Sequence, residues 1–272
     1  MTGKERIDTA LVSGGFFPSR EKAQAAIMAG QVYIGERKVL KPSETVGPDD
    51  GLSVRKPRTE YVSRGALKLG KAVSVFQADL AGSVVLDIGA STGGFTDVCL
   101  RNGAKHVYAV DVGYGQLDWK LRNDPRVTVM ERTNARYLTA DMFPERPRVA
   151  VMDVSFISVR LILPAAAEII GENGVFYTLI KPQFEAGREK VGKKGVVRDP
   201  ETHAEVISGI VSFAETFGWR VVRIDFSPIT GPEGNIEFLA EIRKRTDDSP
   251  VIPEEEIRRV VDAAHRTMKG QS

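Results

Sequence analysis

Short apolar segments recur along the chain from Val84 onward, and most are separated by about 20 to 40 residues, enough for a helix. They are Val84–Ile88, Val107–Val110, Val127–Met130, Val149–Met152, Val175–Ile180, Val221–Ile224 and Ile236–Ile242. This spacing is typical of β-α-β units, so it predicts an α/β fold with a doubly wound, mostly parallel seven-stranded sheet. The interval between Phe226 and Ile236 is too short for a helical crossover. The last strand is therefore expected to be antiparallel.

The pattern before this region is different. Apolar positions at helical spacing predict two short helices, one from Arg6 to about Ser13 and one that begins after Pro18 with Ser19 as its N-cap. Short strands are expected after Gly30, at Val32–Ile34, Val39–Leu40 and Leu52–Val54. Residues 1–58 therefore form a small α+β domain. A linker at 59–62, a larger domain at 63–246 and a charged C-terminal helix or tail at 247–272 follow.

Composition excludes several classes of protein. Of the 272 residues, 42% are hydrophobic and 27% are charged, which is not the composition of a disordered chain. A single cysteine, Cys99, excludes a disulfide framework and a multi-thiolate zinc site, and it fits a reducing compartment. The longest apolar stretch, Val149–Ile170, is interrupted by charged residues, and no signal-like core follows the N-terminus. We expect a cytoplasmic protein without a membrane span.

The net charge of +2 is unevenly distributed. Residues 1–72 contain thirteen Lys and Arg against eight Asp and Glu, whereas acidic residues exceed basic ones in the remainder. A basic module joined to a nearly neutral one suggests a part that holds a polyanion. Chance clustering on a solvated surface explains the charge equally well.

A glycine-rich turn follows the first strand of the predicted sheet. Such a turn lets backbone amides approach a ligand and directs a helix N-terminus at it. It is not a dinucleotide fingerprint, because Ser91 stands where that motif has its second glycine. Asp87 suits a ligand with a cationic ammonium group, and Asp111 can accept both hydroxyls of a ribose. S-adenosylmethionine fits this site, whose expected residues are Asp87, Gly89, Ala90, Ser91, Gly93, Gly94, Phe95 and Asp111.

Charged residues stand at the ends of several predicted strands. Asp153 follows the fourth strand and Lys181 the fifth, and Glu237 begins the last. An antiparallel last strand brings all three to one edge of the sheet, where open α/β sheets bind ligands. Lys68 precedes the sheet on an expected helix. Each residue alone is more easily explained as a structural or solvated ion pair, but three at one edge favour a site.

The residues also resemble a known family. Residues from about Tyr61 to Arg245 resemble FtsJ-like, Rossmann-fold RNA 2'-O-methyltransferases. The pattern from Arg6-Ile-Asp to Lys41-Pro42 resembles an S4 RNA-binding domain. Together with Ser63-Arg-Gly65, Glu131-Arg-Thr-Asn134 and Lys181-Pro-Gln-Phe-Glu185, these motifs are similar to the TlyA (hemolysin A) family of ribosomal RNA methyltransferases.

That resemblance implies a function and a site. It implies a class I methyltransferase that uses S-adenosylmethionine to methylate a ribose 2'-hydroxyl, of a cytidine in 16S or 23S rRNA or both, on ribosomal RNA or subunits. The implied catalytic tetrad is Lys68, Asp153, Lys181 and Glu237, with Lys181 as proton acceptor or alkoxide stabiliser. Asn134 takes the place of the usual acidic residue beside the adenine. RNA phosphates are expected at Arg6, Arg20, Lys22, Lys41 and Arg64.

Two other functions remain as alternatives. One is a methyltransferase-like fold that binds RNA or ribosomes without catalysis, against which the complete tetrad argues. The other is a hemolysin, for which no apolar span or strongly apolar amphipathic helix gives support. The three histidines show no metal-ligand spacing, so no metal site is expected, and Cys99 is expected to pack inside a helix.

Overall fold

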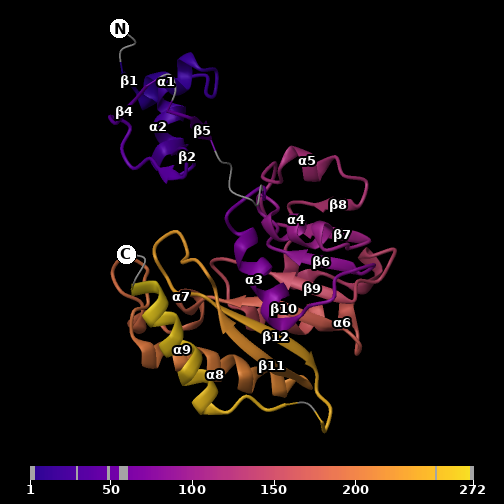
Figure 1. Ribbon diagram of the computed structural model, residues 1–272. Helices are drawn as coiled ribbons and strands as arrows, with labels where there is room; N and C mark the ends of the chain where they lie inside the picture. Colours follow the sequence, from indigo (N-terminus) through magenta and orange to yellow (C-terminus); the bar gives the residue numbers. More distant parts are fainter. Residues whose placement is uncertain (1–3, 29, 48–49, 55–60, 249, 270–272) are drawn as a thin grey trace. The chain divides into compact units, whose positions relative to one another are not determined.

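The computed structural model describes residues 4–28, 30–47, 50–54, 61–248 and 250–269. The chain divides into two compact units, residues 1–60 and 61–272, each with an apolar core of its own (Figure 1). The expected boundary at residue 58 and the first two residues of the linker at 59–62 lie outside the described residues.

The small unit consists of short elements around one core. Its helices are α1 (Ile7–Ser13) and α2 (Arg20–Met28), and its strands are β1 (Glu5–Arg6), β2 (Val32–Ile34), β3 (Arg37–Lys38), β4 (Thr45–Val46) and β5 (Leu52–Val54). β2 pairs with β3 and β5, and β1 pairs with β4, all antiparallel. Ile7, Leu11 and Ile27 fill the core between the helices and strands. The strand predicted at Val39–Leu40 lies two residues earlier, at Arg37–Lys38, because the turn at Gly35 pairs Ile34 with Arg37.

A seven-stranded sheet forms the centre of the large unit. Its order is β11-β12-β10-β9-β6-β7-β8, and β12 runs antiparallel to both of its neighbours. This confirms the predicted fold class, and the predicted strands agree with those observed to within two residues at most ends. The strands are β6 (Val84–Ile88), β7 (His106–Val110), β8 (Val127–Met130), β9 (Val149–Met152), β10 (Val175–Ile180), β11 (Trp219–Phe226) and β12 (Phe238–Lys244).

Helices cover both faces of this sheet. The α-helices are α3 (Ala66–Phe76), α4 (Gly94–Arg101), α5 (Trp119–Arg122), α6 (Leu163–Ile170), α7 (Pro182–Glu185), α8 (Pro200–Thr216) and α9 (Glu254–Lys269). The 3-10 turns are η1 (Ala135–Tyr137), η2 (Ala140–Met142), η3 (Val159–Leu161) and η4 (Arg188–Lys190).

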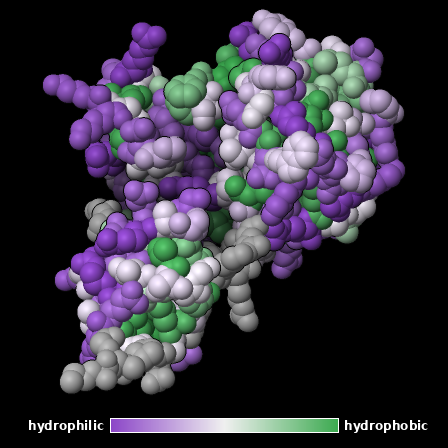
Figure 2. Space-filling model, turned by 90° about the horizontal axis from the view of Figure 1, so that it is seen from above, coloured by the Kyte–Doolittle hydropathy of each residue, from purple (hydrophilic) through white to green (hydrophobic). Residues whose placement is uncertain are grey.

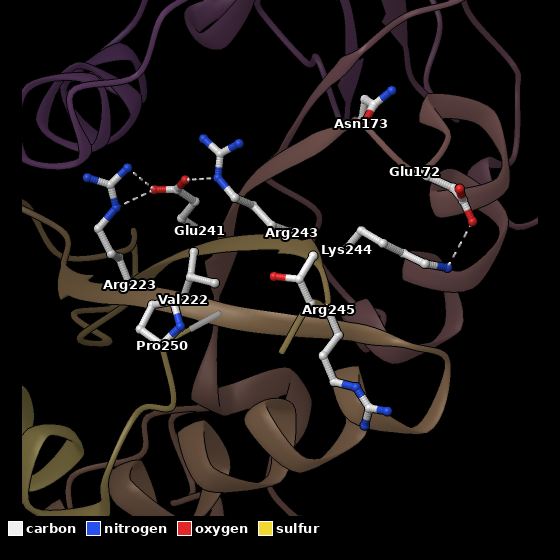
Figure 3. A pocket seen from close by; sticks show the side chains of 11 residues that line it. Glu172, Asn173, Val222, Arg223, Glu241, Arg243, Lys244, Arg245 and Pro250 are labelled. Carbon is white, nitrogen blue, oxygen red and sulfur yellow. Dashed lines mark hydrogen bonds and ion pairs between the residues drawn. The ribbon is translucent and has the colours of Figure 1, made fainter. Parts of the chain in front are cut away.

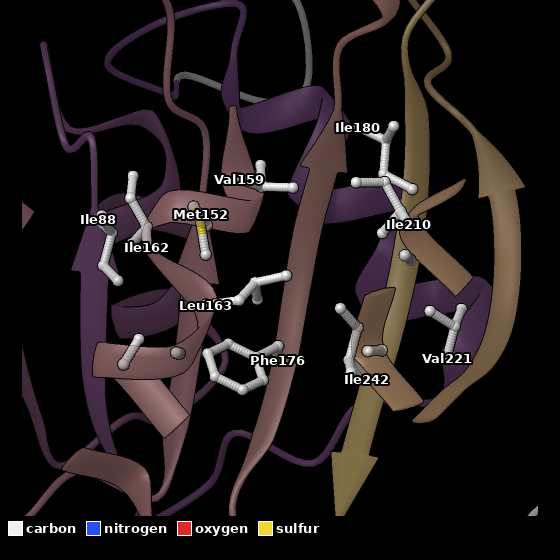
Figure 4. Packing of buried hydrophobic residues seen from close by; sticks show 14 of the residues in the cluster. Ile88, Met152, Val159, Ile162, Leu163, Phe176, Ile180, Ile210, Val221 and Ile242 are labelled. Carbon is white, nitrogen blue, oxygen red and sulfur yellow. The ribbon is translucent and has the colours of Figure 1, made fainter. Parts of the chain in front are cut away.

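Side chains from α3, α4 and α5 form one core layer with the sheet, and those from α6, α8 and α9 form the other. Figure 4 shows Met152, Leu163 and Phe176 meeting in the second layer. Cys99 is fully buried in α4, as expected. Most of the strand β10 is buried on both faces, which explains its continuous apolar sequence.

Hydrophilic side chains cover most of the surface that Figure 2 shows, with smaller apolar areas between them. Among the described residues, no helix is both long and apolar enough to cross a membrane. The C-terminal helix α9 is amphipathic and packs Ile257, Val261 and Ala264 against the core beside α8.

Candidate active site

The glycine-rich turn after β6 adopts a shape that only glycine permits at its first position. Gly89 has a φ of +83°, and a Cβ there would lie 2.7 Å from the carbonyl oxygen of Asp153. The turn is therefore packed directly against the end of the neighbouring strand β9. This close approach brings the cofactor loop and the carboxylate of Asp153 to one place.

Gly93 and Gly94 fix the start of α4. Gly93 has a φ of +95°, and a Cβ on Gly94 would lie 2.8 Å from the backbone nitrogen of Ala66. The segment that begins α3 thus rests on the first turn of α4. Lys68, two residues further along α3, reaches the same edge of the sheet because of this contact.

A hollow of about 440 Å³ lies beside the turn, at the carboxyl ends of β6, β7 and β9. Its walls combine apolar side chains with a few polar ones, which is typical of small-molecule sites. Ile88, Val110, Ile157 and Ile162 supply apolar surface. Asp111 lies on the wall, and its carboxylate accepts hydrogen bonds from the backbone nitrogens of Ser91 (2.8 Å) and Gly113 (2.7 Å). A carboxylate has about four acceptor positions, so Asp111 can still accept ribose hydroxyls.

Asn134 and Asp87 lie at different depths. Asn134 lines the hollow, and its side-chain oxygen accepts a hydrogen bond from the backbone nitrogen of Arg136 (3.1 Å). Asp87 is fully buried beneath the turn, where the hydroxyl of Thr96 donates to one of its oxygens at 2.6 Å. Burial raises the pKa of Asp87 to about 7. Its other oxygen has no hydrogen-bond partner in the described part of the chain. A cation bound near the turn would favour the ionised form of Asp87 through electrostatic attraction, without touching its carboxylate.

A second hollow of about 270 Å³ adjoins the first, and both are lined by Gly89, Ser91, Asp153 and Ser155. Lys68, Lys181 and Arg64 line this second hollow. The two hollows therefore form one cleft with an apolar end and a charged end. The cofactor fits this cleft because the apolar end suits an adenosine, and the buried, partly unsatisfied carboxylate of Asp87 suits a cationic tail.

The charged end contains a linear cluster of two lysines and two carboxylates. Lys181 Nζ lies 2.6 Å from one oxygen of Asp153, and Lys68 Nζ lies 3.6 Å from the other. Lys68 also pairs with Glu237 at 2.6 Å. The structure thus brings together all four residues of the predicted tetrad. Their side chains are only 1–18% exposed, so the ion pairs are poorly screened by water.

The topology explains why these four side chains meet. Asp153 follows β9 and Lys181 follows β10, which are parallel neighbours, so both lie at the carboxyl edge. Glu237 precedes β12, whose first residue, Phe238, pairs with Ile180 at the end of β10. An antiparallel last strand is therefore required for Glu237 to reach the cluster.

Two residues of this site were missed by the sequence analysis. Ser155 accepts a hydrogen bond from Lys181 Nζ at 2.8 Å. Phe156 has a φ of +64° and a side chain that is 92% exposed, at the rim of the first hollow. A bulky residue rarely adopts positive φ, and such strain gathers at functional sites. Both residues follow Asp153 directly in the sequence Asp153-Val-Ser-Phe156, but nothing in that sequence shows which side chain faces the cleft.

The expected RNA contacts have different environments. In the small unit, Arg6 and Arg20 both pair with the buried carboxylate of Asp8, at 3.0 and 2.9 Å, while their side chains remain about half exposed. Lys22 and Lys41 are exposed. In the large unit, Arg64 donates a hydrogen bond to the carbonyl oxygen of Thr230 at 2.5 Å. Arg64 thus also joins the segment before α3 to the segment before β12.

The histidines are less scattered than the sequence suggests. His203 Nδ1 lies 2.9 Å from His265 Nε2, and His203 Nε2 lies 3.2 Å from the carbonyl oxygen of Val197. Since a carbonyl only accepts, His203 carries its proton on Nε2 and accepts from His265. Burial lowers the pKa of His203 to about 4. No group of three possible metal ligands occurs within the residues described.

Two family models match the chain. The model described as FtsJ-like methyltransferase matches residues 61–244, and the S4 domain model matches residues 5–52. The larger match covers the sheet and the whole cleft. The smaller one covers the unit that contains Arg6 and Arg20.

Relatives match nearly the whole chain. The Bacillus subtilis protein YqxC, named as an rRNA methyltransferase, is 52% identical over 98% of this chain and 96% of its own length. The 16S/23S rRNA (cytidine-2'-O)-methyltransferase TlyA of Mycobacterium tuberculosis is 44% identical, over 91% of this chain and 92% of its own length. A Streptococcus thermophilus structure named as a hemolysin has a TM-score of 0.77 and 47% identity, and covers 100% of this chain and 99% of its own.

Proposed function

Since this chain belongs to the TlyA family of S4-containing, FtsJ-like methyltransferases, we propose that it methylates a ribose 2'-hydroxyl of ribosomal RNA. The donor is S-adenosylmethionine, and the target is a cytidine of 16S rRNA, of 23S rRNA or of both, in the cytoplasm, where ribosomes are. The observation that carries the proposal is the buried cluster of Lys68, Asp153, Lys181 and Glu237 at the charged end of the cofactor cleft.

Each part of the cofactor has a proposed partner in the cleft. Bound S-adenosylmethionine supplies a methyl group on a positively charged sulfur. Asp111 accepts the ribose hydroxyls, and Asn134 accepts from the adenine amino group. The turn at Gly89, Ala90 and Ser91 with Gly93, Gly94 and Phe95 provides the surface on which the amino-acid tail lies, above Asp87.

Methyl transfer requires that the 2'-hydroxyl lose its proton as its oxygen forms a bond to the methyl carbon. The methyl–sulfur bond breaks, so the sulfur becomes neutral and one proton is released for each methyl group transferred. Lys181 is the group placed to receive that proton or to hold the forming alkoxide. Asp153 and Ser155 orient its Nζ at 2.6 and 2.8 Å. Lys68, held by Glu237, adds positive charge beside Asp153.

Phe156 offers a surface for the target nucleotide. Its ring is exposed at the rim of the cleft, three residues after Asp153. Aromatic side chains bind unpaired bases by stacking, with a contribution of about 1–3 kcal/mol per base. We propose that Phe156 stacks on the target base and so places its ribose near Lys181.

The small unit is the proposed anchor on ribosomal RNA. Arg6, Arg20, Lys22 and Lys41 are exposed and positively charged, and contacts with phosphates position a protein without reading sequence. Arg64 would add a phosphate contact at the mouth of the cleft.

Methyl-labelled S-adenosylmethionine incubated with intact ribosomes, separated subunits and naked rRNA tests the proposal. We expect label in at least one ribosomal substrate. Lys181→Ala should abolish transfer, whereas Arg258→Ala, which breaks an exposed ion pair with Glu201 on α8, should retain it. Binding of RNA by the wild-type protein without any transfer would favour the non-catalytic alternative instead.

A further inference from the structure

The amino edge of the large sheet, opposite to the active site, is rich in basic side chains. Two adjoining hollows of about 730 and 580 Å³ lie there, and both are lined by Glu172 and Asn173. Three glutamates and six basic residues line the pair, the latter being Arg146, Arg148, Arg223, Arg243, Lys244 and Arg245. Residues 61–272 contain as many acidic as basic residues, so this excess is local.

The larger hollow is built around one buried carboxylate. Glu241 lies in the middle of β12, fully buried, and pairs in register with Tyr177 of β10 and Arg223 of β11. Arg223 and Arg243 each donate from Nε to Glu241 at 2.6 Å, one to each oxygen. Figure 3 shows the two guanidinium groups on opposite sides of this carboxylate.

One carboxylate compensates only one of these two charges. The Arg223 and Arg243 side chains remain 41% and 47% exposed, and a guanidinium has five N–H donors, more than Glu241 can occupy. Lys244 adds a further charge, which is only weakly compensated because its ion pair with Glu172, at 3.7 Å, is exposed to solvent. Fixed guanidinium groups with free donors are well suited to phosphate.

The small unit contains the same arrangement. There Arg6 and Arg20, also about half exposed, share the buried carboxylate of Asp8. That unit matches the S4 domain, and its arginines are proposed RNA contacts. A buried carboxylate with two half-exposed arginines is therefore present in each unit.

We propose that the hollows at the amino edge bind backbone phosphates of ribosomal RNA, as a second contact of the methyltransferase unit remote from its active site. Two adjoining hollows suit successive phosphates of one strand better than a single small anion. The inference rests on the proposed function for the identity of the polymer.

The main test removes the arrangement without leaving Glu241 charged and unpaired. The variant Arg223→Gln/Glu241→Gln/Arg243→Gln is compared with wild type for rRNA affinity between 50 and 200 mM salt. We expect about tenfold weaker binding at low salt. The slope of log K against log salt should fall by about one to two, since each lost phosphate contact removes about 0.7–0.9. Cofactor affinity should not change.

Two further variants keep the test decisive. Arg258→Gln/Arg259→Gln removes two exposed, paired arginines from α9 and should keep the wild-type affinity and slope. Lys244→Gln/Arg245→Gln leaves Glu241 and its partners intact, so it tests RNA binding at the same surface even if the triple variant fails to fold. It should reduce the slope by about one.

RNA binding measured in the presence of inorganic phosphate or pyrophosphate distinguishes RNA phosphates from free phosphate as the ligand of the hollows. Wild-type affinity and slope in both the glutamine triple variant and Lys244→Gln/Arg245→Gln would overturn the proposal. Tight binding of inorganic phosphate at the hollows, together with unchanged RNA affinity in the variants, would also overturn it. If these variants weaken RNA binding while wild type transfers no methyl group, RNA binding at the amino edge stands and the proposed methylation fails.

Discussion

The two edges of the large sheet both carry clusters of basic and acidic side chains, but the clusters differ in composition and exposure. At the carboxyl edge, two lysines and two carboxylates alternate, and all four are nearly buried. At the amino edge, two arginines share one carboxylate, and both remain nearly half exposed. The first cluster is balanced in charge, and the second has a positive excess.

This difference suits the cluster at the carboxyl edge to catalysis and the cluster at the amino edge to binding. A lysine can gain or lose a proton within the range that burial and neighbours allow, whereas an arginine stays charged. Lysines in a dry, balanced cluster can therefore take part in proton transfer. Arginines held at the surface by a buried carboxylate can only attract and orient an anion. Exchanging the residue types should consequently have unequal effects at the two edges.

The largest effect is expected at Lys181. Lys181→Ala should lower kcat by about 100- to 10,000-fold, the range of general acid–base catalysis, while cofactor affinity is retained. Lys181→Arg should be equally inactive, because a guanidinium accepts no proton. Single-turnover methylation and calorimetry with the cofactor measure both quantities. Substantial turnover by the arginine variant would leave alkoxide stabilisation as the only role of Lys181.

A smaller effect is expected at Asp111, on the apolar side of the same cleft. Asp111→Ala removes a charged acceptor from the ribose and two backbone contacts of the turn. A hydrogen bond to a charged group contributes about 1.5–3 kcal/mol, so cofactor affinity should fall tenfold or more. Calorimetry measures the loss, and unchanged affinity would remove Asp111 from the cofactor site.

Lowering the pH should reduce the folding stability of the large unit through His203, which belongs to neither charged cluster. His203 has a pKa of about 4 when folded, below the ordinary 6.5, so the folded state binds fewer protons. Stability is complete above pH 6.5 and falls as the pH decreases from 6.5 towards 4, by up to about 3 kcal/mol. Urea unfolding of wild type and His203→Gln at pH 7 and 5 measures this. Equal pH dependence in both proteins would exclude His203 as the cause.

The smallest effect is expected from Arg223→Lys/Arg243→Lys at the amino edge. The charge is kept and only the planar donor geometry is lost. RNA affinity should fall about two- to threefold, with the salt slope unchanged. A loss as large as that of the glutamine variants would show that geometry, rather than charge, dominates at this edge.

The sequence predicted the large sheet well because its strands are short apolar runs with one helix or turn between most of them. It also placed Asp153, Lys181 and Glu237 at one edge, since parallel neighbours and one antiparallel strand leave no other position. The small strands β1 and β4 were missed, because two-residue strands depend on pairing between Glu5–Arg6 and Thr45–Val46 across the small unit.

Contacts between distant side chains could not be predicted. His203 and His265 are 62 residues apart and meet only because α8 packs on α9. Glu241 looked like one charged residue in a strand, and its two arginine partners were not distinguishable from solvated ones. The depth of Asp87 was also unpredictable, since the sequence does not show how closely the glycine-rich turn covers the end of β6.

The chemical identity of the methylated product distinguishes a ribose target from a base target. Ribosomal RNA labelled by the wild-type protein is hydrolysed with alkali, and the labelled fragment is identified. Methylation of the 2'-hydroxyl removes the nucleophile for alkaline cleavage, so we expect the label in an alkali-resistant dinucleotide. Label in a base-methylated mononucleotide would contradict the assignment of Lys181 and its carboxylates to a ribose hydroxyl.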